Sequence, residues 1–141
     1  MTTGDFALAV HAMVCLLRRG GTLSSEALAE VACTNPVRVR RVMARLRCAG
    51  LVATKEGADG GYSCTCAPDQ ITLRMIADAV EVRFVSAVWR PGQTDMDCLC
   101  ASGMAEVLDD LYGELDALCR THLSHITVAD LAGRIADSKM S

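Results

Sequence analysis

Apolar residues recur at helical spacing through most of the chain, and this pattern predicts a mainly α-helical protein with one small β hairpin. The first apolar stretch, Phe6 to Leu17, lies in a predicted helix over 4–19 that a pair of glycines ends. A short helix over 25–32 follows a serine cap, and a tight connection leads to the next helix, over 36–49. A short helix, a short turn and a second helix form a helix-turn-helix pattern.

The predicted helix over 36–49 combines a buried stripe with a cationic surface. Asn35 is a good N-cap, Pro36 suits a first turn, and Gly50 suits the position just after a helix. The apolar stripe consists of Val39, Val42, Met43 and Leu46. The arginines are Arg38, Arg40, Arg41, Arg45 and Arg47. No acidic residue alternates with them, so pairing within the helix does not explain them. This helix has the form of one that enters a DNA major groove, whereas the alternative is a solvated charged face.

A hairpin follows this helix and completes a winged helix-turn-helix. Leu51–Thr54 and Tyr62–Cys66 are strand candidates, and the glycine-bearing segment 56–61 joins them. For DNA contact we expect Arg38, Arg40 and Arg41 to meet base edges or flanking phosphates. We expect phosphate contacts from Thr34 and Asn35 at the helix start, and from Arg45 and Lys55.

The C-terminal half is helical and contains a heptad-like seam. We divide the chain into a DNA-binding region, 1–66, and a region of linker, cysteine loop and dimerisation helices, 67–141, within one compact domain. A helix starts at Thr72, an irregular loop covers 90–102, and Ser102 is the expected cap of a long helix over 104–123. The seam of that helix is Met104, Leu108, Leu111, Leu115, Leu118 and His122. Its spacing favours a partner helix, most simply from a second copy, over packing on the chain's own core.

Charge is distributed unevenly along the 141 residues. Residues 1–66 hold eight basic and five acidic side chains, a net charge of +3, whereas residues 67–141 hold six and twelve, a net charge of −6. The basic excess therefore coincides with the arginine helix, as nucleic-acid binding requires. The apolar stretch near the start lacks the basic flank of a signal peptide and is too short to span a bilayer. We therefore expect a cytoplasmic protein, not attached to a membrane, whose eight cysteines are reduced.

The sequence also resembles the IscR/NsrR/CymR superfamily of bacterial winged helix-turn-helix regulators, over nearly the whole chain. The segments that match include Asp5–Leu8, Arg45–Val52, the wing segment Gly57–Tyr62 and Ile126–Ala132. The segment Asn35–Arg41 is more similar to the YwnA-type branch. The resemblance implies a homodimer through the 104–123 helix, with two recognition helices facing a palindromic operator in double-stranded DNA. It also implies an arginine before the wing for reading the minor groove, but this chain has Glu56 there.

The cysteines leave the sensing chemistry open. Relatives that carry a cluster have three cysteines before the long helix, whereas this chain has only Cys98 and Cys100. An iron–sulfur cluster would need further ligands. The resemblance implies that helix one of the other subunit can supply an acidic ligand, which is Asp5 in this chain, and Cys119 or His11 is the candidate for a fourth. The second possibility is thiol sensing by Cys98 and Cys100 without any metal or cofactor, which is the one we expect. In the third possibility, Cys98 and Cys100 are small residues without a functional role. Cys15, Cys33 and Cys48 lie in or beside helices and are expected to be buried.

Other classes of protein find little support. The chain has no phosphate-binding glycine loop before a helix, no nucleophile elbow and no paired carboxylates with a base, so we do not expect an enzyme. A thiol- or metal-handling protein would need a CxxC motif near a βαβ pattern, which is absent. A winged helix that binds proteins would favour acidic residues among the arginines. The sequence therefore predicts a DNA-binding regulator, a dimeric repressor with a thiol or small-molecule sensing loop.

Overall fold

The order of the secondary-structure elements agrees with the sequence prediction. The computed structural model describes residues 1–86 and 99–140. The elements are α1 (Thr3–Arg19), α2 (Ser25–Val31), α3 (Pro36–Cys48), β1 (Val52–Lys55), β2 (Gly61–Cys64), the 3₁₀ helix η1 (Pro68–Gln70), α4 (Leu73–Val80), α5 (Leu99–Leu123) and α6 (Val128–Met140). The fold is therefore mainly helical with one small antiparallel sheet, as predicted.

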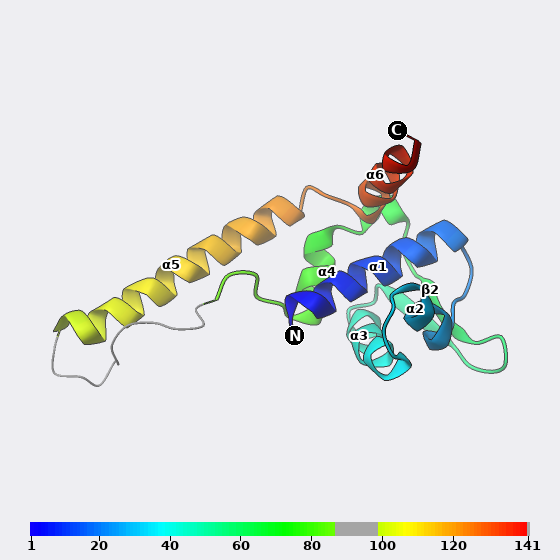
Figure 1. Cartoon of the computed structure of the whole chain (residues 1–141), viewed down its shortest axis with the longest axis horizontal. Coiled ribbons are helices and arrows are strands. Elements are labelled where there is room, and N and C mark those ends of the chain that lie inside the picture. The colour runs from blue at the N-terminus through cyan, green and yellow to red at the C-terminus, as the bar shows by residue number, and fades with distance from the viewer. Residues whose placement is uncertain (87–98, 141) are drawn as a thin grey trace.

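Helix α1 lies at the centre of the core, in contact with α3, α4 and α6 (Figure 1). A capping box begins this helix, in which the Thr2 hydroxyl accepts from the Asp5 amide and the Asp5 carboxylate accepts from the Thr2 amide. The core is aliphatic, as the scarcity of aromatic residues predicts. Its fully buried side chains include Met13, Val39, Val42, Met43, Leu46, Ile76, Val80 and Val82.

The wing is a two-stranded hairpin in which Val52 pairs with Cys64 and Lys55 with Gly61. Leu23 extends it, because its backbone exchanges two hydrogen bonds with that of Tyr62. Gly61 is required at this crossing, since a Cβ there would lie 2.2 Å from the Leu23 carbonyl oxygen. The hairpin is therefore attached to the segment before α2. Each strand differs by one or two residues from the predicted limits.

Helix α5 differs most from the prediction. It begins at Leu99 and not after Ser102, so Ser102 is not its cap and Cys100 lies in its first turn. Between residues 99 and 104 only Gly103 disfavours a helix, and one glycine costs about 1 kcal/mol without ending it. The N-terminal half of α5 projects from the body of the protein (Figure 1). Residues 90–98 of the loop predicted over 90–102, including Cys98, lie outside the described residues.

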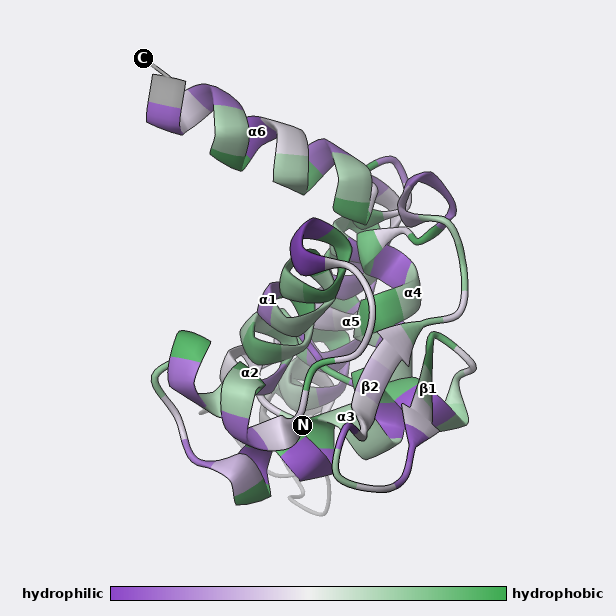
Figure 2. Ribbon diagram, turned by 90° about the vertical axis from the view of Figure 1, so that its right-hand side faces the viewer, coloured by the Kyte–Doolittle hydropathy of each residue, from purple (hydrophilic) through white to green (hydrophobic). Residues whose placement is uncertain are grey.

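Helix α6 closes the C-terminal end of the core. Thr127 and Asp130 form a capping box at its start, with hydrogen bonds of 2.9 and 3.1 Å. The helix carries alternating apolar and polar bands along its length (Figure 2). None of the described helices is long and apolar enough to cross a membrane.

Candidate nucleic-acid interface

Helix α3 has its stripe inward and its arginines outward, as its sequence pattern predicts. Val39, Val42, Met43 and Leu46 are completely buried. The arginine side chains are exposed by 38% at Arg38, 53% at Arg40, 62% at Arg41 and 48% at Arg45. A Schellman motif ends the helix, in which the Leu51 amide donates to the Leu46 carbonyl and Gly50 has a φ of 79°. The buried side chains of this helix therefore anchor it to the core, and its guanidinium groups face solvent.

A buried carboxylate from another helix holds two of these arginines. Oδ1 of Asp5, which is only 3% exposed, accepts hydrogen bonds from Nε of Arg38 and Nη2 of Arg41, both at 3.2 Å. The Thr2 amide, aided by the Thr2 hydroxyl and by both arginines, lowers the pKa of Asp5 to about 2. Asp5 therefore stays ionised and opposes two positive charges with one negative charge. The sequence analysis missed this contact.

Two further arginines form ion pairs at the surface. Arg40 Nη2 lies 2.9 Å from Glu26 Oε1, and Arg45 Nη1 lies 3.1 Å from Glu81 Oε2. Both glutamates are well exposed, at 66% and 70%. Such pairs contribute roughly 0–1 kcal/mol each. A phosphate could therefore replace either glutamate at little cost.

The start of α3 offers polar and apolar groups side by side. The Asn35 side chain accepts from the Arg38 amide at 2.9 Å, so its oxygen already caps the helix. Thr34 is half-buried beside it. Val37 is 70% exposed, off the buried stripe, and was not singled out from the sequence. A solvent-facing valine at this end of the helix is suited to contact a thymine methyl group.

The wing lies on the same side of the body as α3 and away from α6 (Figure 1). Lys55, at the end of β1, is exposed, as is Glu56 after it. The structure therefore places Thr34 and Asn35 just before α3, the arginines on α3 itself, and Lys55 on the neighbouring hairpin.

The cysteines are distributed differently from the prediction. Cys33 and Cys48 are exposed, so the expectation that they are buried is wrong, while Cys15 is half-buried. Burial raises the pKa of the Cys15 thiol. Cys33 follows the end of α2 and Cys48 is the last residue of α3, where the chain turns at the surface. Cys100 is exposed in the first turn of α5. Of the two predicted sensing residues, only Cys100 is therefore described.

The proposed cluster ligands do not converge in the described residues. Both oxygens of the Asp5 carboxylate already accept hydrogen bonds, Oδ2 from Thr2 and Oδ1 from the two arginines. Cys100 and Cys119 are 19 residues apart on one helix, hence roughly 28 Å. Within the described part of the chain, no group of three or more His, Cys, Asp or Glu could hold a metal ion. The described residues of a single chain therefore do not form an iron–sulfur site by themselves.

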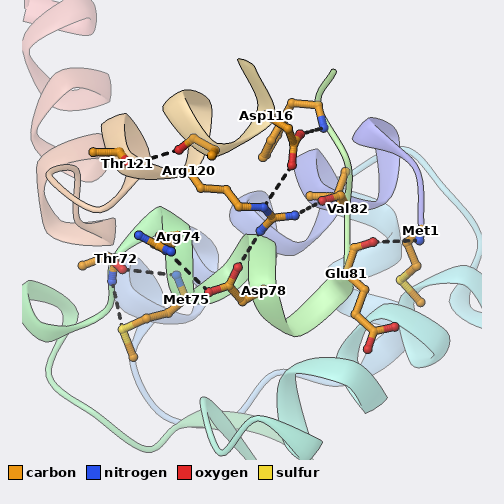
Figure 3. Close-up of polar contacts among 12 residues, drawn as sticks. Met1, Thr72, Arg74, Met75, Asp78, Glu81, Val82, Asp116, Arg120 and Thr121 are labelled. Atoms are coloured by element: carbon orange, nitrogen blue, oxygen red, sulfur yellow. Dashed lines mark hydrogen bonds and ion pairs between the residues drawn. The ribbon is translucent and has the colours of Figure 1, made fainter. Parts of the chain in front are cut away.

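The base of α5 is joined to α4 by a polar network (Figure 3). Arg120 donates to Asp116 on its own helix, to Asp78 on α4 and to the Val82 carbonyl. Asp116 is 7% exposed and accepts from the amides of Phe84 and Val85, at 2.7 and 3.1 Å. Burial raises the pKa of Asp116, but these amides and Arg120 outweigh that effect and lower it overall. The segment that leads to the cysteine loop is therefore anchored to α5.

A recognition helix with exposed arginines, a hairpin wing and a long projecting helix define a winged-helix transcription regulator. The chain belongs to the Rrf2 family, described as iron-dependent transcriptional regulators, whose pattern matches residues 2–134. No curated sequence matches the chain significantly.

Solved structures support this assignment. A candidate transcriptional regulator from Lactobacillus plantarum is 27% identical, with a TM-score of 0.77 over 94% of this chain and 89% of that chain. IscR from T. potens is 22% identical, with a TM-score of 0.70 over 97% and 89%. CymR, the global cysteine regulator of B. subtilis, is 23% identical, with a TM-score of 0.66 over 92% and 94%. The last two show a shared fold, and the similarity to the YwnA-type branch stays a prediction.

Proposed function

We propose that this protein is a dimeric repressor that binds a palindromic DNA operator through α3. The observation that carries the proposal is the solvent-facing row of arginines on a helix whose other face is fully buried. The family assignment supports DNA-binding regulation. Arg38, Arg40 and Arg41 contact base edges or adjacent phosphates, while Thr34, Asn35, Arg45 and Lys55 contact phosphates. Two such helices in a dimer read half-sites about one helical turn apart, roughly 34 Å.

Selection from random-sequence duplexes, followed by footprinting, tests this proposal. We expect a palindrome whose half-sites are separated by about one turn, with each protomer protecting one half. Binding should weaken steeply with salt, because arginine contacts to phosphate release counterions. Recovery of no common sequence, or of an asymmetric site bound by a monomer, would contradict the proposal.

The dimer forms through α5 in this proposal. Four apolar side chains along its seam or beside it are at least 45% exposed in the single chain: Met104, Val107, Leu111 and Leu118. Such a row of solvent-exposed apolar residues on one helix is typical of a surface that a partner covers. We expect Leu118→Glu to give a monomer in sedimentation and to abolish operator binding. The matched control is Ala117→Glu, an exposed position off the seam. Dimers that persist with Leu118→Glu would place the interface elsewhere.

The proposed signal is thiol oxidation at Cys98, which lies outside the described residues, with Cys100 as second thiol. A peroxide oxidises the Cys98 thiolate to a sulfenic acid and is itself reduced to water. A neighbouring thiol then forms a disulfide with it and releases a second water. We expect colourless protein whose operator affinity falls with hydrogen peroxide and returns with dithiothreitol, and Cys98→Ser should abolish this response. A brown anaerobic preparation with iron and acid-labile sulfide would instead support an iron-dependent sensor, as the family description indicates.

A further inference from the structure

We infer that Asp5 is a positioning residue for sequence-specific DNA recognition, which acts by directing the side chains of Arg38 and Arg41. The inference rests on the proposed DNA-binding function. Asp5 is on α1 and far from α3 in sequence, yet its carboxylate is the only acidic group among the described residues that pairs with these two arginines. Arg38 and Arg41 are three positions apart and so lie on one face of α3.

The carboxylate is itself held in place before it meets the arginines. Its Oδ2 accepts from the Thr2 amide and hydroxyl, each at 3.1 Å, within the capping box of α1. This leaves Oδ1 for Arg38 and Arg41, at 3.2 Å each. A fixed acceptor restricts the rotamers of two long side chains. The entropy that they would otherwise lose on binding DNA is then already lost in the free protein.

The other ion pairs of α3 do not have a buried carboxylate as acceptor. Glu26 also accepts from the Ser25 hydroxyl, but Glu26 and Glu81 are mostly exposed and are not packed in place, whereas the Asp5 side chain is only 4% exposed. Arg41 keeps a 62% exposed side chain while bound to Asp5, so it remains accessible to DNA. The negative charge of Asp5 also opposes attraction to phosphate. Asp5 should therefore favour specific over non-specific binding, at some loss of total affinity.

The test compares operator and random-sequence DNA as the salt concentration is varied, using full-length Asp5→Asn. Removing one negative charge should raise the affinity for random DNA and steepen the salt slope by about one. The ratio of operator affinity to random affinity should fall by roughly tenfold, the size expected when one directed arginine contact to a base is lost. A purely structural role would instead reduce both affinities together.

Three further variants distinguish an effect on the positioning of Arg38 and Arg41 from an effect on the stability of the fold. Asp5→Glu keeps the charge and a residue favoured in capping boxes, so the protein should fold, yet the longer side chain should still lower the ratio. Thr127→Ala removes the comparable capping hydroxyl of α6, which does not contact Asp5 or its arginines, and should lower the melting temperature without changing the ratio. Glu26→Gln frees Arg40 and should raise non-specific affinity with the ratio unchanged.

The outcomes distinguish this inference from the function on which it rests. If the unmodified protein does not prefer any sequence, the proposed function fails. If it is specific, and Asp5→Asn and Asp5→Glu keep the same ratio, Asp5 does not position the arginines. The same conclusion follows if Thr127→Ala, which only destabilises the fold, lowers the ratio as much as Asp5→Asn does.

Discussion

In the proposed complex with DNA, the ion pairs of individual residues on α3 determine how much of its positive charge is available. Five arginines face three carboxylates, Asp5, Glu26 and Glu81, which leaves two positive charges in excess. Among the described residues no ion pair involves Arg47, near the C-terminal end of the helix. Arg40 and Arg41 are the most exposed of the paired arginines, and their pairs can exchange with phosphate or base acceptors. They are therefore the first residues to test.

We predict that Arg40→Ala or Arg41→Ala weakens operator binding by about 1–3 kcal/mol where the contact is to a base edge. A contact to phosphate would instead flatten the salt slope by about one and leave sequence preference unchanged. Gel-shift titrations over a salt series distinguish the two cases. Unchanged affinity and slope in both variants would show that another face of α3 meets the DNA.

The ionised form of Asp5 makes stability depend on pH in the acid range. Its pKa is about 2 in the folded protein, below its ordinary value of 3.8. A lowered pKa stabilises the fold fully above the ordinary value, and this contribution is lost as pH falls through the folded value. The gap in melting temperature between the unmodified protein and Asp5→Asn should therefore be widest above about pH 4 and narrow toward pH 2. A gap that is constant with pH would mean that the carboxylate charge contributes nothing to stability.

At the scale of elements, local sequence patterns were sufficient to predict a helix where the signals that begin it and bury it lie within or beside that helix. The cap at Asn35, the proline after it and the four-residue stripe predict α3 to within one residue. The pairing of Asp5 with Arg38 was not predicted, because 33 residues separate them and no periodicity connects them. Likewise, residue type suggested burial for Cys33 and Cys48, but their places at helix ends expose them. Sequence alone therefore predicted the limits and the buried face of α3 but not the carboxylates that pair with its arginines.

The wing is the second element that we expect to contact DNA, and a substitution that changes its charge tests this contact. Glu56 follows β1 at an exposed position, and its carboxylate opposes entry into a negatively charged minor groove. We predict that Glu56→Arg tightens operator binding, most strongly for A·T-rich flanks, whose narrow groove concentrates negative potential. Binding measured on operators with A·T-rich and G·C-rich flanks checks this. Asp59→Arg, in the same loop, is the control for added charge alone. Equal or weaker binding by Glu56→Arg would show that the wing does not approach the groove.

Across the whole molecule, α4 connects the long helix to the recognition helix. Asp116 and Arg120 on α5 hold the backbone of Val82–Val85 and the Asp78 carboxylate of α4 (Figure 3). One turn further, Glu81 at the end of α4 pairs with Arg45 of α3. Phe84 also packs edge-on against Phe6 of α1, with ring centroids 5.0 Å apart. A displacement of α5 in the proposed dimer would therefore change contacts made by α1 and α3, the two helices that carry Asp5 and the arginines.

We predict that Arg120→Gln weakens this junction more than any change to an exposed pair. The Arg120 side chain is 18% exposed, and its loss leaves the buried Asp116 carboxylate with two amide donors among the described residues, those of Phe84 and Val85. Removing a charged partner from a buried group costs about 2–3 kcal/mol, hence a fall in melting temperature of roughly 5–10 °C for a chain of this size.

Arg74→Gln is the matched control for this variant. Arg74 meets the exposed Asp78 side chain only at 3.8 Å, so its loss should change stability by less than about 1 kcal/mol. If α4 transmits the state of α5 to α3, Arg120→Gln should also reduce the effect of peroxide on operator affinity, measured at a temperature where the variant is fully folded. A variant that is as stable as the unmodified protein would show that solvent already screens this network. A variant that is less stable but keeps the full peroxide response would exclude the junction as the route between the two helices.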